Sequence, residues 1–190
     1  MLSCTLVYRM NKQALLTNSN LLLFHTGDLS TIWGTKSANT LYTTIKRFVQ
    51  TNKIFRIQKG LYSLIKPEKV DPLLVSRKLI KGYCYLSLET VLFQSGFRSQ
   101  RPFHYSFVGE KCLILDWNDI NVKSHQLADK FLYNDTETFI ENNIRQAKPL
   151  RAICDALYFN PLAHFDKDIN WKEVTELQNE IGYPISKERL

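Results

Sequence analysis

Residues 37–64 constrain the fold of this chain more than any other stretch, because a helical pattern there is followed directly by a hairpin pattern. Ser37 is a suitable N-cap, and apolar residues then recur at helical spacing along one face. The predicted inward-facing residues are Ala38, Leu41, Ile45, Phe48 and Val49. Asn52 and Lys53 would close this helix.

Two short strands are expected next, over residues 54–57 and 61–65. They would turn at Gln58-Lys59-Gly60, since glycine tolerates the positive φ that a tight turn needs. Before the helix, Asp28 is a candidate N-cap for a short helix that ends at Gly34, and residues 11–22 look helical as well. Helix, helix and hairpin in this order predict a winged helix-turn-helix domain over residues 1–69.

The outward face of the main helix has the composition of a DNA-reading surface. It carries short hydrogen-bonding side chains and cations but no acidic residue, namely Lys36, Asn39, Thr40, Thr43, Lys46, Arg47 and Gln50. Asn, Gln and Arg can read base edges in a major groove, whereas Lys and Thr more often hold phosphates. The hairpin would present Arg56, Gln58 and Lys59 to the flanking backbone. A solvated helix face is the alternative, although such a face normally mixes both signs of charge.

Charge is distributed unevenly along the chain. Residues 1–81 hold 13 Lys+Arg against 3 Asp+Glu, while residues 82–190 hold 12 against 15. The total of +7 is therefore +10 in the first part and −3 in the second. A one-sided excess of cations attracts a polyanion and makes binding sensitive to salt, so it supports double-stranded DNA as the partner of the first part.

No apolar run approaches the roughly 18 residues that a membrane span needs. Met1 to Met10 has Arg9 after its apolar residues and lacks a small-residue cleavage site, which argues against a signal peptide. We therefore expect a cytoplasmic protein with no membrane partner.

Cysteine and histidine spacing gives no sign of a metal site. Cys4, Cys84, Cys112 and Cys154 lie far apart among apolar or aromatic neighbours and are predicted to be buried, reduced thiols. The histidines, His25, His104, His125 and His164, are scattered and form no known ligand motif. The sequence predicts neither a metal nor a cofactor.

Residues 70–190 are predicted to form a small α+β domain. Pro72 suits the first turn of a helix that runs to Leu79, and Ser87 would cap another helix that stops at Gly96. Alternating residues between 103 and 122 favour two or three strands. Near the end, a helix with four apolar residues at helical spacing would dock on the domain or form a dimer surface: Trp171, Val174, Leu177 and Ile181.

The same region offers no catalytic constellation. Asp116, Asp119 and Glu110 lie close in sequence but lack a loop that could seat a nucleotide phosphate, and no Gly-rich nucleotide motif or nucleophile elbow occurs. Arg151 and Asp155 stand at i and i+4 on a predicted helix, where a salt bridge is a better interpretation than a catalytic pair. We expect that the protein is not an enzyme.

Three segments resemble a known family. They are RIQKGLYSL (residues 56–64), YLSLETVLFQSGF (residues 85–97) and AKPLRAICDALY (residues 147–158). In this order and at these distances they resemble the AbiEi-type antitoxins of type IV abortive-infection toxin–antitoxin systems. The resemblance implies a winged-helix protein that represses its own operon and opposes a nucleotidyltransferase-like toxin.

The sequence therefore predicts an α+β protein that binds its own promoter as an antitoxin and autorepressor. A homodimer, or two copies bound side by side, would match paired half-sites in the operator. A stand-alone winged-helix regulator without a toxin, whose second domain senses a ligand or only dimerises, is the main alternative. An interaction module whose basic face is incidental is a third interpretation.

Overall fold

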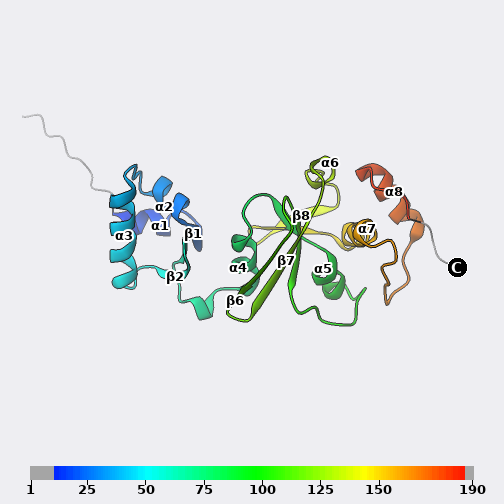
Figure 1. Ribbon diagram of the computed structural model, residues 1–190, viewed down its shortest axis with the longest axis horizontal. Coiled ribbons are helices and arrows are strands. Elements are labelled where there is room, and N and C mark those ends of the chain that lie inside the picture. The colour runs from blue at the N-terminus through cyan, green and yellow to red at the C-terminus, as the bar shows by residue number, and fades with distance from the viewer. Residues whose placement is uncertain (1–10, 187–190) are drawn as a thin grey trace, which may run out of the picture. The chain divides into compact units, whose positions relative to one another are not determined.

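The protein has a mixed α+β fold, which confirms the predicted class. The structure is a computed structural model that describes residues 11–186, and these residues form eight α-helices, one 3-10 helix and nine strands in two sheets. The chain divides into two compact units, Met1–Asp71 and Pro72–Leu190. Each unit has its own sheet (Figure 1).

Unit 1 is built around one antiparallel sheet of three strands in the order β1-β3-β2. Its elements in chain order are α1 (Lys12–Thr17), β1 (Leu23–His25), α2 (Thr26–Ile32), α3 (Ala38–Gln50), β2 (Phe55–Gln58), β3 (Leu61–Ser63) and the 3-10 helix η1 (Pro67–Lys69). The two strands of the predicted hairpin are thus present, and β1 adds a third strand that the sequence pattern did not identify.

Helix α3 begins where the sequence predicts, because the Ser37 side chain accepts a hydrogen bond from the Thr40 backbone N–H. The core of unit 1 includes three of the five expected inward residues from α3, and Val49 is half-buried against it. Ala38 is exposed, so its assignment to the inward face was wrong. It is the first residue of α3, and the adjoining residues Ser37, Asn39 and Thr40 are exposed as well. Thr44 is buried instead, and its hydroxyl donates to the Thr40 carbonyl at 2.8 Å.

Helix α2 begins three residues before the position predicted from Asp28 as the N-cap. His25 occupies the N-cap, and the Asp28 carboxylate accepts the His25 backbone N–H at 2.8 Å from inside the first turn. Asp28 is therefore a first-turn residue rather than the N-cap, and its negative charge still stabilises the helix N-terminus. Helix α1 is also shorter than the expected 11–22 segment.

A compact aromatic contact joins the helices of unit 1. The rings of Trp33 and Phe48 lie 5.0 Å apart, and the Trp33 indole N–H donates to the Lys12 carbonyl at 3.0 Å. The indole thus fills the core with its apolar body and satisfies its polar atom at the rim, as buried tryptophans generally do. These contacts link α1, α2 and α3.

Unit 2 is a six-stranded mixed sheet in the order β6-β7-β5-β4-β9-β8. Its elements are α4 (Pro72–Leu79), β4 (Cys84–Leu86), α5 (Leu88–Gln94), β5 (Tyr105–Gly109), β6 (Leu113–Trp117), β7 (Ile120–Gln126), α6 (Asp129–Leu132), β8 (Thr138–Glu141), β9 (Ile144–Ala147), α7 (Pro149–Phe159) and α8 (Trp171–Ile181). The β4–β9 and β5–β7 pairs are parallel, and the remaining pairs are antiparallel.

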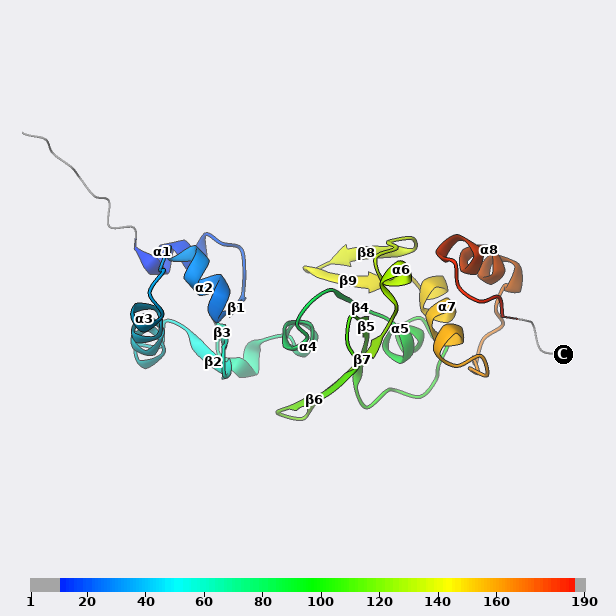
Figure 2. The ribbon, with the colours of Figure 1, turned by 45° about the horizontal axis from the view of Figure 1, so that its top comes forward.

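Helices cover both faces of this sheet. Helix α4 packs on β7, α5 packs on β5 and α7, and α8 packs on α7. Figures 1 and 2 show α4 on one side of the strands and α5 with α7 on the other. The sheet is therefore the middle layer of unit 2, and its parallel pairs have the two-sided cover that parallel strands require.

The predicted helices of unit 2 are present, but one predicted N-cap makes no capping hydrogen bond. Helix α4 starts at Pro72, Gly96 adopts φ +75° just after α5, and α8 buries Val174, Leu177 and Ile181. Ser87 stands at the N-cap of α5 but makes no capping hydrogen bond, so the predicted capping role was wrong. Within residues 11–186, no helix is long and apolar enough to span a membrane.

Candidate functional site

The polar side of helix α3 is exposed as the sequence predicts. The seven polar residues of the predicted DNA-reading face are all exposed: Lys36, Asn39, Thr40, Thr43, Lys46, Arg47 and Gln50. Lys36 lies just before the helix, and the others follow along one side of it. We call this set the α3 face. It contains three cations and no carboxylate.

The side chains of the α3 face are free to contact a ligand. Across the described residues, Asn39, Lys46, Arg47 and Gln50 make no side-chain hydrogen bond or ion pair. Thr43 differs, because its hydroxyl donates to the Asn39 carbonyl at 2.8 Å. Its hydroxyl proton is thereby used within the helix, and only its methyl group and an oxygen lone pair face outward. The free amides and cations keep all of their donors.

The hairpin of β2 and β3 carries a second group of exposed polar side chains on unit 1. Arg56, Gln58 and Lys59 are exposed, and Ile57 between them is buried and anchors the strand. The register of the β2–β3 pair shifts between Arg56 and Gln58, which marks a bulge next to the turn. Gly60 has φ +84°, the left-handed conformation expected for this turn.

The base of this turn is tied to helix α2. The Thr26 backbone N–H donates to the Gly60 carbonyl at 3.0 Å. This hydrogen bond connects the hairpin turn to the first residue of α2. The three hairpin residues and the seven residues of the α3 face all lie exposed on this unit.

Other exposed groups of unit 1 extend its polar surface. Tyr42 on α3 is 58% exposed, so it belongs to the surface and not to the core. Lys53 and Lys12 are placed over aromatic rings, with Lys53 Nζ 5.4 Å from the Phe48 ring centroid and Lys12 Nζ 5.4 Å from that of Trp33. These cation–π contacts hold two further positive charges on this unit.

Unit 2 contains a fully buried polar network around the predicted pair on α7. Arg151 Nε lies 3.0 Å from Asp155 Oδ1, and neither side chain is exposed. Tyr183 donates to the same oxygen at 2.7 Å, and Ser87 donates to Asp155 Oδ2 at 2.7 Å. Arg151 Nη2 donates to the Tyr85 hydroxyl at 3.0 Å. We call these five residues the Arg151 network.

The rest of the Arg151 guanidinium binds backbone carbonyls. Nη1 donates to Asn134 and Thr136 at 3.0 and 3.1 Å, and Nη2 donates to Phe131 at 3.2 Å. Burial alone lowers the pKa of Arg151, but the Asp155 carboxylate more than offsets this and keeps it above its ordinary value. Burial raises the pKa of Tyr85 and of Tyr183 well above ordinary values, so both phenols stay protonated.

The Arg151 network is structural in its chemistry. Every N–H of the Arg151 guanidinium and both Asp155 carboxylate oxygens are hydrogen-bonded, and neither group reaches solvent, so no substrate can contact them. The predicted salt bridge is confirmed, but its complete burial was not foreseen. The sequence interpretation missed Tyr85, Ser87 and Tyr183, because no local spacing links positions this far apart in the chain.

The carboxylates considered for catalysis do not converge. Asp116 and Asp119 are exposed on β6 and its turn, whereas Glu110 accepts the Tyr83 backbone N–H at 2.7 Å. In the part of the chain with described coordinates, no three His, Cys, Asp or Glu side chains are grouped to hold a metal ion.

The cysteines fall into two classes. Cys84 and Cys154 are buried free thiols, and burial raises the pKa of Cys84 to about 11 and that of Cys154 to about 12. Cys112 is an exposed free thiol, so its predicted burial was wrong. It lies between β5 and β6, where neighbouring apolar residues on an edge strand do not cover it. Cys4 lies outside the described residues, as does the segment from Met1 to Met10.

Comparison with known proteins identifies a similar fold. No protein-family model matches the sequence, and no curated protein matches it. The structure resembles the crystal structure of the RV2827C protein from Mycobacterium tuberculosis, with a TM-score of 0.50 and 13% sequence identity. The match covers 90% of this chain and 70% of that chain. At this identity the likeness concerns the fold alone.

Proposed function

We propose that this protein binds double-stranded DNA through unit 1, which acts as a winged helix-turn-helix domain. The α3 face carries this proposal, because it gathers unpaired cations and amides on one exposed side of a helix without a carboxylate. The order of α2, α3 and the β2–β3 hairpin, with β1 completing a small sheet, supports the same assignment. The positive charge of residues 1–81 supports a polyanionic partner.

Helix α3 would lie in the major groove, where each side chain has a distinct task. Asn39, Arg47 and Gln50 can make paired hydrogen bonds with base edges. Lys36, Lys46 and Thr40 can hold phosphates, and this fixes the register of the helix on the duplex. Thr43 can only accept a hydrogen bond or present its methyl group to a base, because its hydroxyl proton is used within the helix.

The hairpin would act as the wing of the domain. Arg56, Gln58 and Lys59 are exposed around its turn and can contact the sugar–phosphate backbone beside the groove. Such contacts add affinity that depends on salt and little sequence preference. The α3 face and the wing would therefore contribute different properties to one complex.

We further propose that the biological role is that of an AbiEi-type antitoxin and autorepressor in the cytoplasm. This step is supported by the three sequence segments that resemble the family. Binding at its own promoter would repress transcription by occupying the site, and a dimer or two adjacent copies would engage paired half-sites. Unit 2 would then be the part available to oppose a nucleotidyltransferase-like toxin. This role involves neither catalysis nor a cofactor.

Binding to the DNA upstream of its own gene tests the proposal. We expect the purified protein to prefer that duplex over a scrambled one, with affinity that falls steeply between two salt concentrations. The double variant Lys46→Ala/Arg47→Ala should bind more weakly, lower the salt slope by about 1 through the lost Lys46 phosphate contact, and lose sequence preference through the lost Arg47 base contact. A Lys111→Ala/Lys172→Ala variant removes two exposed cations from unit 2 and should bind as the wild type does. Equal binding by all three proteins would refute the role of the α3 face.

A stand-alone regulator is the second candidate function. It is favoured by a groove of about 460 Å³ in unit 2, because this volume suits a small effector molecule. The neighbouring gene separates the two roles. A nucleotidyltransferase-like frame beside this gene, whose toxicity is relieved by co-expression of this protein, would support the antitoxin. Promoter binding without such a frame would support the regulator.

A further inference from the structure

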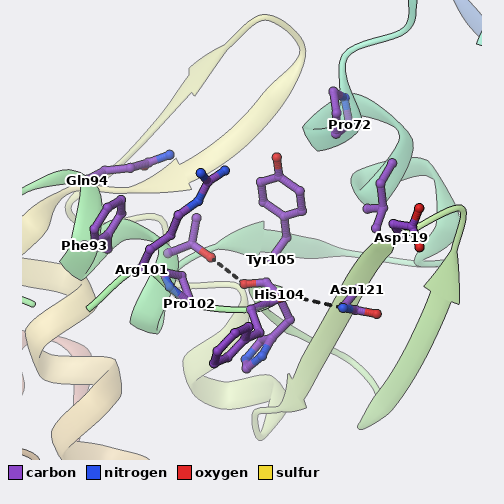
Figure 3. Close-up of a pocket in the computed structure, with 12 residues that line it drawn as sticks. Pro72, Phe93, Gln94, Arg101, Pro102, His104, Tyr105, Asp119 and Asn121 are labelled. Atoms are coloured by element: carbon purple, nitrogen blue, oxygen red, sulfur yellow. Dashed lines mark hydrogen bonds between the residues drawn. The ribbon is translucent and has the colours of Figure 1, made fainter. Parts of the chain in front are cut away.

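Unit 2 contains an open groove that is separate from the Arg151 network. It has a volume of about 460 Å³ and lies between the start of α4, the end of α5, the segment that leads into β5, and the turn between β6 and β7. Figure 3 shows side chains from these four elements around one space. A groove of this volume falls in the range of small-molecule sites.

Hydrogen bonds hold the segment that forms one wall of the groove. The Asn121 side-chain amide donates to the Phe103 carbonyl at 3.3 Å, and the Thr90 hydroxyl donates to the His104 carbonyl at 3.5 Å (Figure 3). The Thr90 oxygen also accepts the Ser106 backbone N–H at 2.8 Å. The wall is thus tied to α5, β5 and β7, so a ligand would meet a largely preformed surface.

Three polar side chains face this space without a protein partner. Arg101 and Gln94 are exposed, Tyr105 is half-buried, and none of their polar side-chain atoms is hydrogen-bonded to the described residues. In Figure 3 the Arg101 guanidinium, the Gln94 amide and the Tyr105 hydroxyl extend to the same side of the groove. A guanidinium that is accompanied by a hydroxyl and an amide is a suitable donor set for a carboxylate or a phosphate.

Aromatic surface lies beside these donors. Phe93 and Tyr105 are half-buried walls of the groove, and Phe103 at its edge is 84% exposed. Such exposure is unusual for phenylalanine, and covering the ring with an apolar or aromatic group would be favourable. The groove therefore has aromatic surface on which a ring can stack, next to the donors that can bind an anion.

The opposite side of the groove has negative charge. Asp119 lies at the β6–β7 turn, and in Figure 3 Tyr105 stands between it and Arg101. A second anionic group at that end would be repelled, whereas an amino group or another hydrogen-bond donor would be accepted. The two ends of the groove therefore impose a direction on any bound molecule.

We propose that this groove binds a small molecule that combines a flat unsaturated ring with a single anionic group. Arg101 holds the anion together with Gln94 and the Tyr105 hydroxyl, and the ring rests against Phe93 and Tyr105. A nucleoside monophosphate and an aromatic carboxylate share this chemistry. The site is independent of DNA binding by unit 1, since all of its lining residues belong to unit 2.

Calorimetric titration of the full chain with AMP and with indole-3-acetate tests the site. We expect at least one of them to bind, and the uncharged analogues adenosine and indole-3-acetamide, which lack the anion, to bind about tenfold more weakly or not at all. Preference for AMP would identify a phosphate ligand, and preference for indole-3-acetate would identify a carboxylate; either supports the proposal. Absence of binding by both anionic probes at about 10 mM would overturn it.

Two variants separate this site from unspecific attraction. Arg101→Ala should weaken binding of the anionic probe about tenfold while the melting transition stays unchanged, because the Arg101 side chain has no hydrogen-bond or ion-pair partner among residues 11–186. Lys111→Ala removes an exposed cation that does not line the groove, and it should bind the probe as the wild type does. Equal loss in both variants, or no loss in Arg101→Ala, would also overturn the proposal.

Discussion

Arg151 and Asp155 form an ion pair of 3.0 Å one turn apart on α7, and both side chains are completely buried. Removal of two charges from water is costly, and here the cost is offset by hydrogen bonds to nearly every polar atom of the pair. These bonds reach Ser87 before α5, Tyr85 on β4 and Tyr183 after α8. The pair therefore links elements of unit 2 that are distant in sequence.

Loss of one member of this pair should destabilise unit 2 severely. Arg151→Met leaves the Asp155 carboxylate buried without its cation, and we expect the free energy of unfolding to fall by about 3–5 kcal/mol. Urea denaturation measures the change. Lys148→Ala is the control, because Lys148 forms an exposed ion pair with Glu137 at 3.2 Å and should cost at most about 1 kcal/mol. Similar costs for the two variants would contradict the structural role of the network.

Phe48 tests the orientation of α3. Its ring is 5% exposed and packs on Trp33, so Phe48→Ala leaves a cavity and should cost about 3–5 kcal/mol of the stability of unit 1. Hydrogen exchange would show lost protection in residues 12–63 and unchanged protection in the sheet of unit 2. Native protection in unit 1 would mean that the ring is not part of the core.

Two glycines of unit 1 should respond in opposite directions to alanine. Gly60 has φ +84°, so Gly60→Ala should cost about 1–2 kcal/mol in backbone strain, although the new Cβ meets only Thr26 Oγ1 at 3.6 Å. Gly27 lies in the first turn of α2 with open space around its Cβ position, and Gly27→Ala should stabilise unit 1 by about 0.4–1 kcal/mol. Thermal unfolding of both variants provides the comparison, and equal shifts would contradict the assigned turn.

Acid should weaken unit 2 through His125. Burial holds the pKa of His125 below its ordinary value of 6.5, and the nearby Lys123 charge lowers it further. His104 also lowers this pKa, whereas Glu89 raises it without cancelling the other effects. The folded state therefore binds fewer protons than the unfolded state just below pH 6.5, and stability present above that pH is lost as the pH falls through the lowered pKa. Urea titrations between pH 8 and pH 5 measure this loss.

His125→Gln should flatten the stability profile between pH 8 and pH 5, because it removes the titrating group. An unaltered profile in this variant would assign the loss to another group.

A further loss of stability is expected at lower pH from Glu89. Burial raises its pKa, but its own backbone N–H, the neighbouring Ser106 hydroxyl and the nearby His125 and His104 together outweigh burial and hold the pKa below its ordinary value of 4.5. This carboxylate therefore stabilises the fold above about pH 4.5, and protonation removes that contribution.

The thiols should differ in reactivity. In a Cys4→Ser background, a thiol reagent at pH 8 should label Cys112 in the folded protein, because that thiol is exposed. Cys84 and Cys154 are buried with pKa values of about 11 and about 12, and they should react only after unfolding. Mass spectrometry of the labelled peptides distinguishes the three sites. Rapid labelling of Cys154 in the folded state would show that α7 is accessible.

Helix α3 shows how much of unit 1 could be predicted from the sequence. Its cap at Ser37, its buried residues Leu41, Ile45 and Phe48, and its polar face all follow from a local repeat of 3.6 residues. The prediction was wrong at Ala38, which is exposed together with its neighbours at the start of the helix. Local periodicity does not reveal at which residue of a helix burial begins.

The groove and the cysteines show where prediction from sequence ended. Arg101, Tyr105 and Asp119 come from a loop, a strand and a turn, and no spacing in the chain indicates that they surround one space. Cys112 has apolar neighbours, yet it lies exposed near an edge strand, and the sequence does not reveal which strand is at the edge. Pairing between strands decides both features.

The amino-acid sequence by itself determined the α+β class, the position of α3, the composition of its exposed face and the turn at Gly60, because each depends on residues within a few turns of one another. Tertiary structure alone decided the sheet order β6-β7-β5-β4-β9-β8 and the assembly of Tyr85, Ser87 and Tyr183 around the ion pair on α7. The physical reason is that a buried charge needs partners in three dimensions, and those partners are chosen by the packing of whole elements and not by their spacing along the chain.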